Sequence, residues 1–502
     1  SRIKWLVMRL GNGALSLAQA EEISAALHRF RDHKKFVVAQ ATGFLTSGLG
    51  DYVAAAAADQ IWVQPKSDFK VSGGGVGEIF LKGLLDKIQA VPQMAKRAEF
   101  KSAADMYMEK AMTAPDREQL TRVAQSTYDS GVAAIAAARH LDPAAVRAAL
   151  DASPQLSEDA LAAHLIDHIG YDDDLAAQAL AKAGAGAKAV KIRDYVRSRE
   201  PSLNAPIAVV EASGEIRDGT AGNSLLGGNE GIASDDLSKA ISEATKDKSI
   251  KAIVLRVDSP GGSVSASDQI LHAVKKAQAA GKKVVVSMGS VAASGGYYIS
   301  LSADRIVAQP ATLTGSIGVL TGKVSVNKTL GLAGVTAEQV SAGKNTLMDS
   351  PLQPYTPDQW AAVNHEADVI YDDFTAKVAA GRKLPLAQVR DVARGRVWTG
   401  ADAKTHGLVD QLGGFWTAAA LAARLSGVDP DNTNFRIYPR QTGLLGGFRA
   451  ALGGMEGALG TLSQIRILLG LPGVQEVVRG AAEMPRSAVE LRAPGLTRQP
   501  GL

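Results

Sequence analysis

The stretch that decides the fold is Ala252-Ile253-Val254-Leu255-Arg256-Val257-Asp258-Ser259-Pro260-Gly261-Gly262-Ser263. Its first six residues predict a buried strand, and the Pro-Gly-Gly turn ends that strand. Downstream, the pattern predicts a helix over 267–280, a strand over 283–288, a helix from Ala293 and a strand over 305–308. Short apolar strands that alternate with helices indicate βαβ crossovers and a mainly parallel sheet, so the fold class is α/β.

The unit that contains this stretch occurs about twice in the chain. Three collinear segments match at nearly constant offsets: 3–10 with 250–257 (250 − 3 = 247), 58–65 with 303–310 (303 − 58 = 245) and 164–167 with 407–410 (410 − 167 = 243). Collinear matches with so little drift indicate a tandem duplication with small insertions and deletions.

The duplication predicts how the chain is divided. We expect an N-terminal repeat over 1–182, a linker over 183–205, a C-terminal repeat over 206–440 and a Gly-rich tail over 441–502. About 44 residues precede Ile250 in the second repeat (250 − 206 = 44), whereas Ile3 nearly begins the first. We therefore expect the first repeat to be truncated at its start, or to lack one strand. The tail is expected to be partly ordered, with a position on a membrane surface as the alternative.

Composition excludes several classes of protein. The 502 residues are 46% hydrophobic and 21% charged, the mixture of a globular protein that needs at least two domains. The 55 Lys and Arg against 51 Asp and Glu give a net charge of +4 and predict no nucleic-acid partner. With no cysteine, thiol catalysis and zinc sites of the cysteine type are excluded. The sequence contains no apolar stretch that is long enough and free enough of charge to predict a membrane span. Its first residues do not resemble a signal peptide.

Three turns that follow predicted strands are candidates for a site, because open α/β sheets bind ligands at strand ends. The turn at Gly261 and Gly262 leaves backbone N–H groups unshielded. The turn at Ser294 places a hydroxyl at a helix start beside the N–H of Gly295. The third turn carries Ser316. A Gly-Ser turn of this kind more often has only a structural role, so for each turn taken alone a structural role stays open beside a functional one.

A serine nucleophile needs a base, and none of the eight histidines lies in a recognisable catalytic setting. His365-Glu366 lacks the second histidine of a zinc-protease helix, and Gly343-Lys344 lacks the rest of a phosphate-binding loop. We predict neither a metal nor a cofactor. Lysine remains as the base, and it can act as one if burial lowers its pKa.

These motifs together resemble the long, duplicated form of signal peptide peptidase A, also called protease IV. Besides the three turns, Phe100-Lys101-Ser102-Ala103 is similar to the Tyr-Lys-Ser-Ala motif that carries the family's base, with phenylalanine replacing tyrosine. The resemblance covers about residues 2–440. It implies a serine endopeptidase of the crotonase-like fold shared with Clp-type peptidases, built from two repeats.

The resemblance also assigns roles to residues. Ser294 would be the nucleophile and Lys101 its base, Ser316 would orient the lysine, and Gly295 with Gly261 or Gly262 would bind the oxyanion. It implies a homotetramer that degrades cleaved signal peptides and short unfolded chains. Its members are tied to the bacterial cytoplasmic membrane, on the periplasmic face, by an N-terminal helix that we do not find in this sequence.

The duplication tests these assignments. Ser294 corresponds to Leu49 (294 − 49 = 245), so the first repeat lacks a nucleophile there, although Ser47 lies two residues away. Lys101 corresponds to Lys344 (344 − 101 = 243), so both repeats carry a candidate base. We favour Lys101, which lies in the family motif. Two other functions stay open: a catalytically idle peptide-binding or membrane scaffold, and an acyl-CoA hydratase or isomerase of the same fold.

Overall fold

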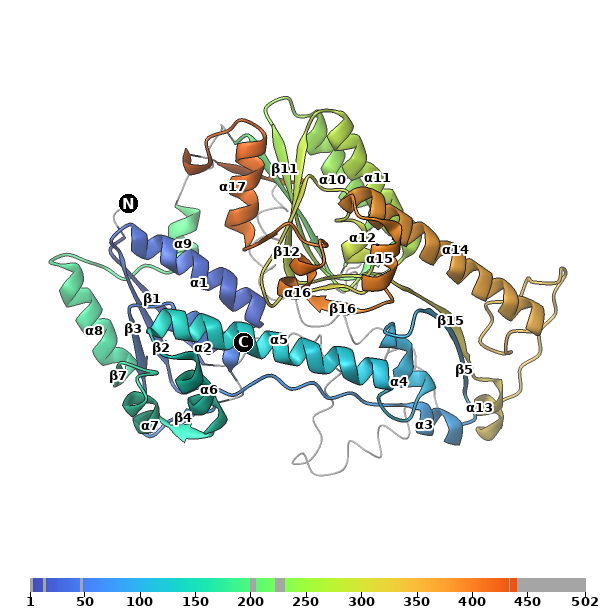
Figure 1. Cartoon of the computed structure of the whole chain (residues 1–502), viewed down its shortest axis with the longest axis horizontal. Helices are drawn as coiled ribbons and strands as arrows, with labels where there is room; N and C mark the ends of the chain where they lie inside the picture. Colours follow the sequence, from blue (N-terminus) through green and yellow to red (C-terminus); the bar gives the residue numbers. More distant parts are fainter. Residues whose placement is uncertain are drawn as a thin grey trace.

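The computed structural model describes residues 3–11, 15–45, 48–198, 205–221, 231–432 and 434–439. Two α/β units, each built on a sheet of mainly parallel strands, lie against each other (Figure 1). Ser47, most of the linker after 198 and the tail beyond 440 lie outside the described residues.

The N-terminal unit contains a four-stranded parallel sheet of order β1-β2-β3-β7. Its elements are β1 (Trp5–Leu10), α1 (Leu17–Asp32), β2 (Phe36–Ala41), α2 (Leu49–Ala56), β3 (Gln60–Val63), β4 (Asp68–Phe69), α3 (Lys82–Lys87), β5 (Val91–Arg97), a 3-10 turn (Ser102–Ala104), α4 (Asp105–Met108), α5 (Ala114–Arg139), α6 (Pro143–Asp151), β6 (Gln155–Leu156), α7 (Ser157–Ala162), β7 (His168–Ile169) and α8 (Asp172–Ala183). The short helix α9 (Ile192–Arg197) lies in the predicted linker.

The C-terminal unit contains an eight-stranded, mainly parallel sheet, with β16-β14-β12-β11-β8-β18 as its main path. Off this path, β13 pairs with β12, and β17 pairs with β13. Its elements are β8 (Ile207–Ser213), β9 (Ile216–Arg217), β10 (Ile232–Ala233), α10 (Ser234–Lys246), β11 (Ala252–Ser259), α11 (Val264–Ala279), β12 (Lys283–Ala293), α12 (Gly295–Tyr298), β13 (Arg305–Ala308), β14 (Leu313–Gly315), β15 (Val319–Ser325), α13 (Asn327–Leu332), α14 (Pro357–Arg382), α15 (Leu386–Val392), β16 (Val397–Thr399), α16 (Gly400–Thr405), β17 (Gln411–Leu412), α17 (Phe415–Leu425), a 3-10 turn (Pro430–Asn432) and β18 (Phe435–Tyr438). Apolar side chains fill both faces, with α10 and α11 on one side and α17 on the other.

The predicted duplication is confirmed element by element. Helix α11 follows α1 at 264 − 17 = 247, α13 follows α3 at 327 − 82 = 245, and α14 follows α5 at 357 − 114 = 243. Even a buried contact is repeated: Tyr52 Oη donates to the carbonyl of Leu165, and Tyr297 Oη to that of Leu408. The described first unit begins at the counterpart of β11 and contains no counterpart of β8.

Three local predictions differ from the structure at element ends. Helix α11 begins at Val264 because Ser263 Oγ accepts the N–H of Ala266 and caps it three residues earlier than predicted. The sequence Ser234-Asp235-Asp236 also predicts a helix cap, but Ser234 is the first residue of α10, and its hydroxyl donates to Gln269. Strand β12 continues to Ala293, since its second half pairs with β14.

Strand β5 of the first unit and β15 of the second form a two-stranded antiparallel ladder of seven residue pairs. Figure 1 shows this ladder to the right of α5, beyond the N-terminal end of that helix. Helix α5 itself crosses beneath the second unit in this view. Arg122 on α5 forms an ion pair with Asp402. The ladder fixes the segment after β5 against the start of β15, and this junction contains the candidate site.

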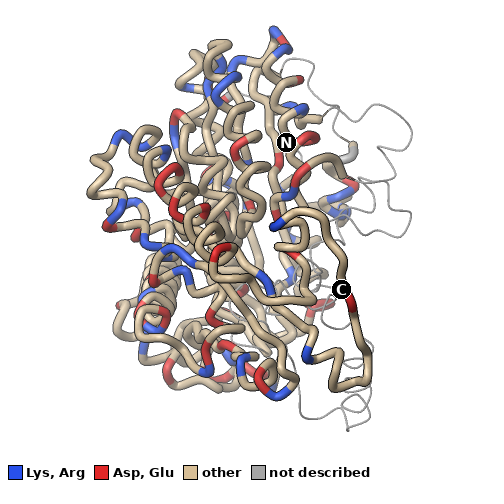
Figure 2. The backbone as a smooth tube through the Cα atoms, turned by 90° about the vertical axis from the view of Figure 1, so that its right-hand side faces the viewer, with Lys and Arg blue, Asp and Glu red and all other residues tan. Residues whose placement is uncertain are grey.

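Lys and Arg alternate with Asp and Glu over the face that Figure 2 presents. Among the described residues, no helix combines the length and apolar character needed to cross a bilayer.

Candidate active site

Ser294 lies at a strained turn between a strand and a helix. It follows the end of β12 and precedes α12, with φ 53° and ψ −116°, a conformation that a residue with a side chain rarely adopts. Its N–H donates to the carbonyl of Gly315 at 2.9 Å, so the adjacent strand β14 holds the turn. The turn projects the Ser294 hydroxyl at the carboxyl edge of the sheet, as in other strand-to-helix nucleophile turns.

Two backbone N–H groups beside Ser294 are available for an oxyanion. The N–H of Gly262 and that of Gly295 have no acceptor among the described residues. The N–H of Gly261, by contrast, already donates to Ser259 Oγ at 3.2 Å. Of the two loop glycines, Gly262 is therefore the better candidate donor.

Gly261 has a different role: it lets the backbone of its loop approach the turn at Ser294 and Gly295 closely. At φ +108°, a β-carbon on it would lie 2.7 Å from the nitrogen of Gly295 and 2.9 Å from the β-carbon of Ser294. Only glycine lets the loop pass this close to the nucleophile turn.

Lys101 comes from the other unit and meets Ser294. Its side-chain amine donates to Ser294 Oγ at 3.0 Å, to Ser316 Oγ at 2.9 Å and to the Ser316 carbonyl at 3.1 Å. The residue is only 7% exposed. Burial lowers the pKa of Lys101 from 10.5 to about 8, because desolvation disfavours the charged amine and no carboxylate offsets it. The amine can therefore be neutral near physiological pH.

Two glycines of the second unit pack directly on Lys101, and sequence reasoning missed both. A β-carbon on Gly395, at φ +75°, would lie 2.6 Å from the β-carbon of Lys101, and one on Gly318 would lie 3.2 Å from its δ-carbon. Gly318 belongs to the Ser316 turn, so its motif was visible. The Gly395 contact joins residues that are distant in the sequence and has no local signal.

The neighbours of Lys101 fix it in place. Ser316 adopts φ 50°, and its N–H donates to the carbonyl of Arg396 at 2.7 Å. Phe100, which replaces the tyrosine of the family motif, is buried, and the guanidinium of Arg396 lies 4.6 Å from its ring centroid. The Phe100 carbonyl accepts from Gln119 on α5 at 3.0 Å.

The second candidate base, Lys344, lies elsewhere. Its amine pairs with Asp358 at 2.8 Å, and its side chain is 75% exposed. This carboxylate raises the pKa of Lys344, so the amine stays charged. In the first unit the vacant turn is filled: Leu49 is buried and packs against Gly131 of α5.

The described residues hold no group of three or more His, Asp or Glu side chains placed to bind a metal ion. The arrangement around Ser294 brings together a hydroxyl, a buried amine and two N–H donors. Such a set suits nucleophilic attack on a carbonyl.

Comparisons with known proteins agree with this geometry. The family model of peptidase family S49 matches residues 29–186 and 276–429, more than half of the chain, with one matched segment in each unit. The chain belongs to peptidase family S49. The Clp protease family model also matches residues 229–313, as the predicted Clp-type fold requires.

Relatives confirm the resemblance to signal peptide peptidase A. Protease 4 of Salmonella typhi is 35% identical over 80% of this chain and 66% of its own length. Protease 4 of Haemophilus influenzae is 32% identical over 84% and 70%, and the chloroplastic serine protease SPPA of Arabidopsis thaliana is 29% identical over 85% and 64%. The chain thus spans about two thirds of the length of these relatives.

Among solved structures, a mutant of the 1510-N membrane-bound stomatin-specific protease in complex with a substrate peptide is 14% identical. It covers 51% of this chain and 100% of its own, with a TM-score of 0.30.

Proposed function

We propose that this chain is a serine endopeptidase in which Ser294 is the nucleophile and Lys101 the general base. The observation that carries the proposal is the 3.0 Å contact between the Lys101 amine and Ser294 Oγ, in a site that holds no carboxylate near the amine. A lysine buried in this way can accept a proton at neutral to alkaline pH.

The reaction follows from the positions of these groups. Neutral Lys101 accepts the proton of Ser294 as its oxygen attacks the scissile carbonyl, and the N–H groups of Gly295 and Gly262 bind the resulting oxyanion. The protonated amine then donates to the leaving nitrogen, and an acyl-enzyme ester remains on Ser294. A water molecule that Lys101 deprotonates hydrolyses this ester. Ser316 positions the amine throughout by accepting hydrogen bonds at Oγ and at its carbonyl.

We further propose peptides as substrates, with small or apolar residues before the cleaved bond. By resemblance to signal peptide peptidase A, these are cleaved signal peptides and short unfolded chains, degraded by a homotetramer at the periplasmic face of the bacterial cytoplasmic membrane. The family membership supports this proposal.

The test is hydrolysis of a fluorogenic peptide and of a synthetic signal peptide by the wild type and three variants. We expect Ser294→Ala and Lys101→Ala to lose activity by a factor of 10³ or more, on the order of other dyad and triad knockouts. Lys344→Ala is the matched control, because it removes the corresponding lysine of the second repeat and should leave activity unchanged. Full activity in Ser294→Ala would exclude Ser294 as the nucleophile. A wild type that hydrolyses neither peptide would favour the alternatives, an idle scaffold or an acyl-CoA enzyme, which needs no serine.

A further inference from the structure

The buried side chain of Gln119, on the second turn of α5, contacts both residues that flank Lys101. Its Nε2 amide donates to the carbonyl of Phe100 at 3.0 Å and to Ser102 Oγ at 2.9 Å. Gln119 is 1% exposed, so bulk water does not compete for these contacts. One amide group therefore fixes the segment that carries Lys101 on both sides of the lysine.

The oxygen of the same amide reaches the strands that hold the turn of Ser294. Gln119 Oε1 accepts the N–H of Val397, the first residue of β16, at 3.2 Å. In the ladder of β16 with β14, Val397 lies opposite Gly315, whose carbonyl accepts the N–H of Ser294. One side chain thus connects the segment of the base with the strands behind the nucleophile, although the two belong to different units.

Glutamine is the side chain of this length that can make both contacts. The Phe100 carbonyl needs a donor and the Val397 N–H needs an acceptor, and a primary amide carries both on one flat group. An ionised glutamate would offer only acceptors, while lysine and arginine offer only donors. The two partners also fix the orientation of the Gln119 amide, because exchanging its oxygen and nitrogen would leave both contacts unsatisfied.

A pair of carboxyl groups holds Gln119 in turn. Asp116 is fully buried one turn earlier on α5, and its Oδ1 accepts from Gln119 Nε2 at 3.0 Å. No N–H or hydroxyl group of the described residues reaches its other oxygen, Oδ2. The Asp116 side chain does form a hydrogen bond with the carboxyl group of Glu78. Since one carboxylate cannot donate to another, Glu78 carries the proton of this bond.

The surroundings of Glu78 favour its protonated form. Burial, the hydrogen bond to Asp116 and the nearby charges of Asp116 and Asp105 raise the pKa of Glu78 to about 8. Asp105 is itself paired with Lys96. At neutral pH Glu78 is therefore a donor, and a chain of hydrogen bonds runs from Glu78 through Asp116 to Gln119.

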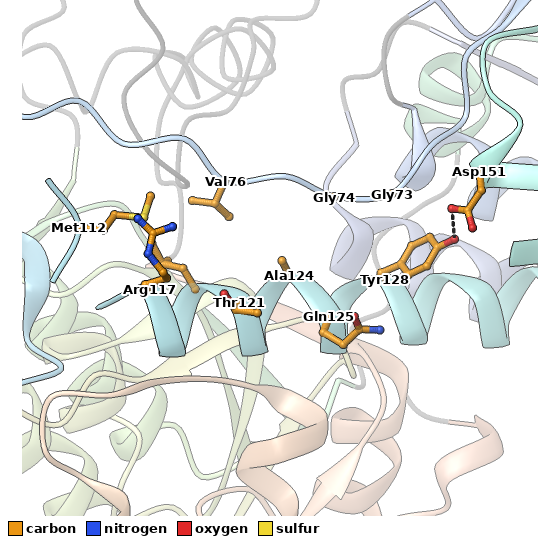
Figure 3. A pocket seen from close by; sticks show the side chains of 11 residues that line it. Gly73, Gly74, Val76, Met112, Arg117, Thr121, Ala124, Gln125, Tyr128 and Asp151 are labelled. Carbon is orange, nitrogen blue, oxygen red and sulfur yellow. Dashed lines mark hydrogen bonds between the residues drawn. The ribbon is translucent and has the colours of Figure 1, made fainter. Parts of the chain in front are cut away.

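The segment that carries Glu78 runs along α5. Figure 3 shows it passing over the helix through Gly74 and Val76, and both residues line a cavity of about 410 Å³ together with Arg117. Arg117 directly follows Asp116, so the segment arrives at the first turn of the helix, where Glu78 meets Asp116.

The second repeat lacks this arrangement. The counterparts of Gln119, Asp116 and Glu78 are Ala362 (362 − 119 = 243), Gln359 (359 − 116 = 243) and Lys323 (323 − 78 = 245). Its lysine, Lys344, is exposed and paired with Asp358. Both repeats contain a lysine at this position, but only the repeat whose lysine is buried contains the glutamine. The amide therefore accompanies the buried base and not the lysine alone.

We propose that Gln119 is a positioning residue for Lys101, and that the carboxyl pair of Glu78 and Asp116 fixes Gln119. The amide keeps the Lys101 amine within hydrogen-bond reach of Ser294 and away from water, so it acts on the base and not on the substrate. Its catalytic consequence rests on the proposed function, in which Lys101 is the base, whereas the placement of the amine does not.

The first test is Gln119→Leu, which has a similar volume but no amide. We expect kcat to fall about 10- to 100-fold while KM changes by less than about twofold, because no substrate contact is lost. Without the amide the Lys101 segment relaxes and its amine becomes hydrated. The midpoint of the kcat/KM profile should therefore rise above about 8, toward the ordinary lysine pKa of 10.5. A loss of stability alone would not move this midpoint.

Ser126→Ala is the matched control. Ser126 is buried on the same helix and shares a hydrogen bond of 2.7 Å with Thr399 on the same strand, β16. It has no hydrogen bond to either neighbour of Lys101 within the described chain. We expect Ser126→Ala to keep the wild-type kcat and midpoint. A Gln119→Leu enzyme with wild-type kcat and midpoint, or a Ser126→Ala enzyme with the same defects, would overturn the proposal.

Two substitutions of Glu78 test the carboxyl pair. Glu78→Gln retains a donor for Asp116, whereas Glu78→Leu leaves the buried carboxylate without one. We expect Glu78→Gln to retain about three- to tenfold more activity at pH 7 than Glu78→Leu. Equal activity of the two variants would exclude Glu78 from the positioning of Gln119.

Trace acetylation of Lys101, followed by mass spectrometry across pH, measures the amine without peptide hydrolysis. Its midpoint should lie near 8 in the wild type and in Ser126→Ala, and higher in Gln119→Leu. This shift, together with a wild type that hydrolyses no peptide, would support the positioning by Gln119 and refute the proposed function. Unchanged labelling in Gln119→Leu, together with lost hydrolysis in Ser294→Ala, would refute the positioning alone.

Discussion

Replacing Lys101 with methionine should remove activity and change how stability depends on pH. Methionine keeps most of the volume of the lysine stem but carries no charge. In the wild type, the folded state holds Lys101 with a pKa of about 8 instead of 10.5. Between these two values the unfolded chain binds more protons than the folded one, so wild-type stability rises with pH.

The magnitude follows from this difference in pKa. At about 1.4 kcal/mol for each unit of pKa, burying the amine costs the folded wild type about 3 kcal/mol at pH 7, and about 2 kcal/mol of this cost is relieved by pH 9.5. The three hydrogen bonds that methionine loses count against the variant, but their loss is nearly constant over this range. The stability difference between wild type and Lys101→Met should therefore shift by about 2 kcal/mol in favour of the wild type from pH 7 to pH 9.5.

The assay is urea unfolding of both proteins at the two pH values, followed by tryptophan fluorescence. The free energies of unfolding are compared where both proteins show the same dependence on urea concentration. All other titrating groups are common to both proteins and cancel in the comparison. A difference that stays constant within about 0.5 kcal/mol, or that shifts in the opposite direction, would refute a depressed lysine pKa. Lys344→Met is the control, because that exposed lysine should give no shift of this sign.

Three further results are expected. The value of kcat/KM should rise from acid toward alkaline pH with a midpoint near the Lys101 pKa of about 8, whereas a flat profile would exclude a lysine base. Ser316→Ala should lower kcat by about 10- to 100-fold with little change in KM, because the amine loses one hydrogen bond and its orientation but no substrate contact; an unchanged kcat would show that the Ser316 carbonyl suffices. Gly395→Ala should lower activity at least tenfold, because the added β-carbon displaces Lys101. Circular dichroism confirms that the variant folds. Gly427→Ala controls for backbone strain alone, since Gly427 also has a positive φ but nothing lies within 4 Å of its β-carbon position.

The sequence by itself determined the α/β class, the duplication and the position of the candidate nucleophile turn. These are local or periodic features: strands of apolar residues, offsets of 243 to 247, and a serine followed by two glycines. It also showed that Leu49 stands in the first repeat at the position of Ser294, the candidate nucleophile. The glycine loop was visible too, because close backbone approach requires this residue type.

Only the tertiary structure decided which lysine meets Ser294. Lys101 and Lys344 are equivalent by sequence offset, and their difference lies in the surroundings: one amine is desolvated between two serines, and the other is exposed beside Asp358. Tertiary structure also distinguished Gly262, with its N–H available, from Gly261, whose N–H is bound by Ser259. Burial and partner geometry depend on residues that lie far apart in the chain, such as Gly395 against Lys101, and no local pattern records them.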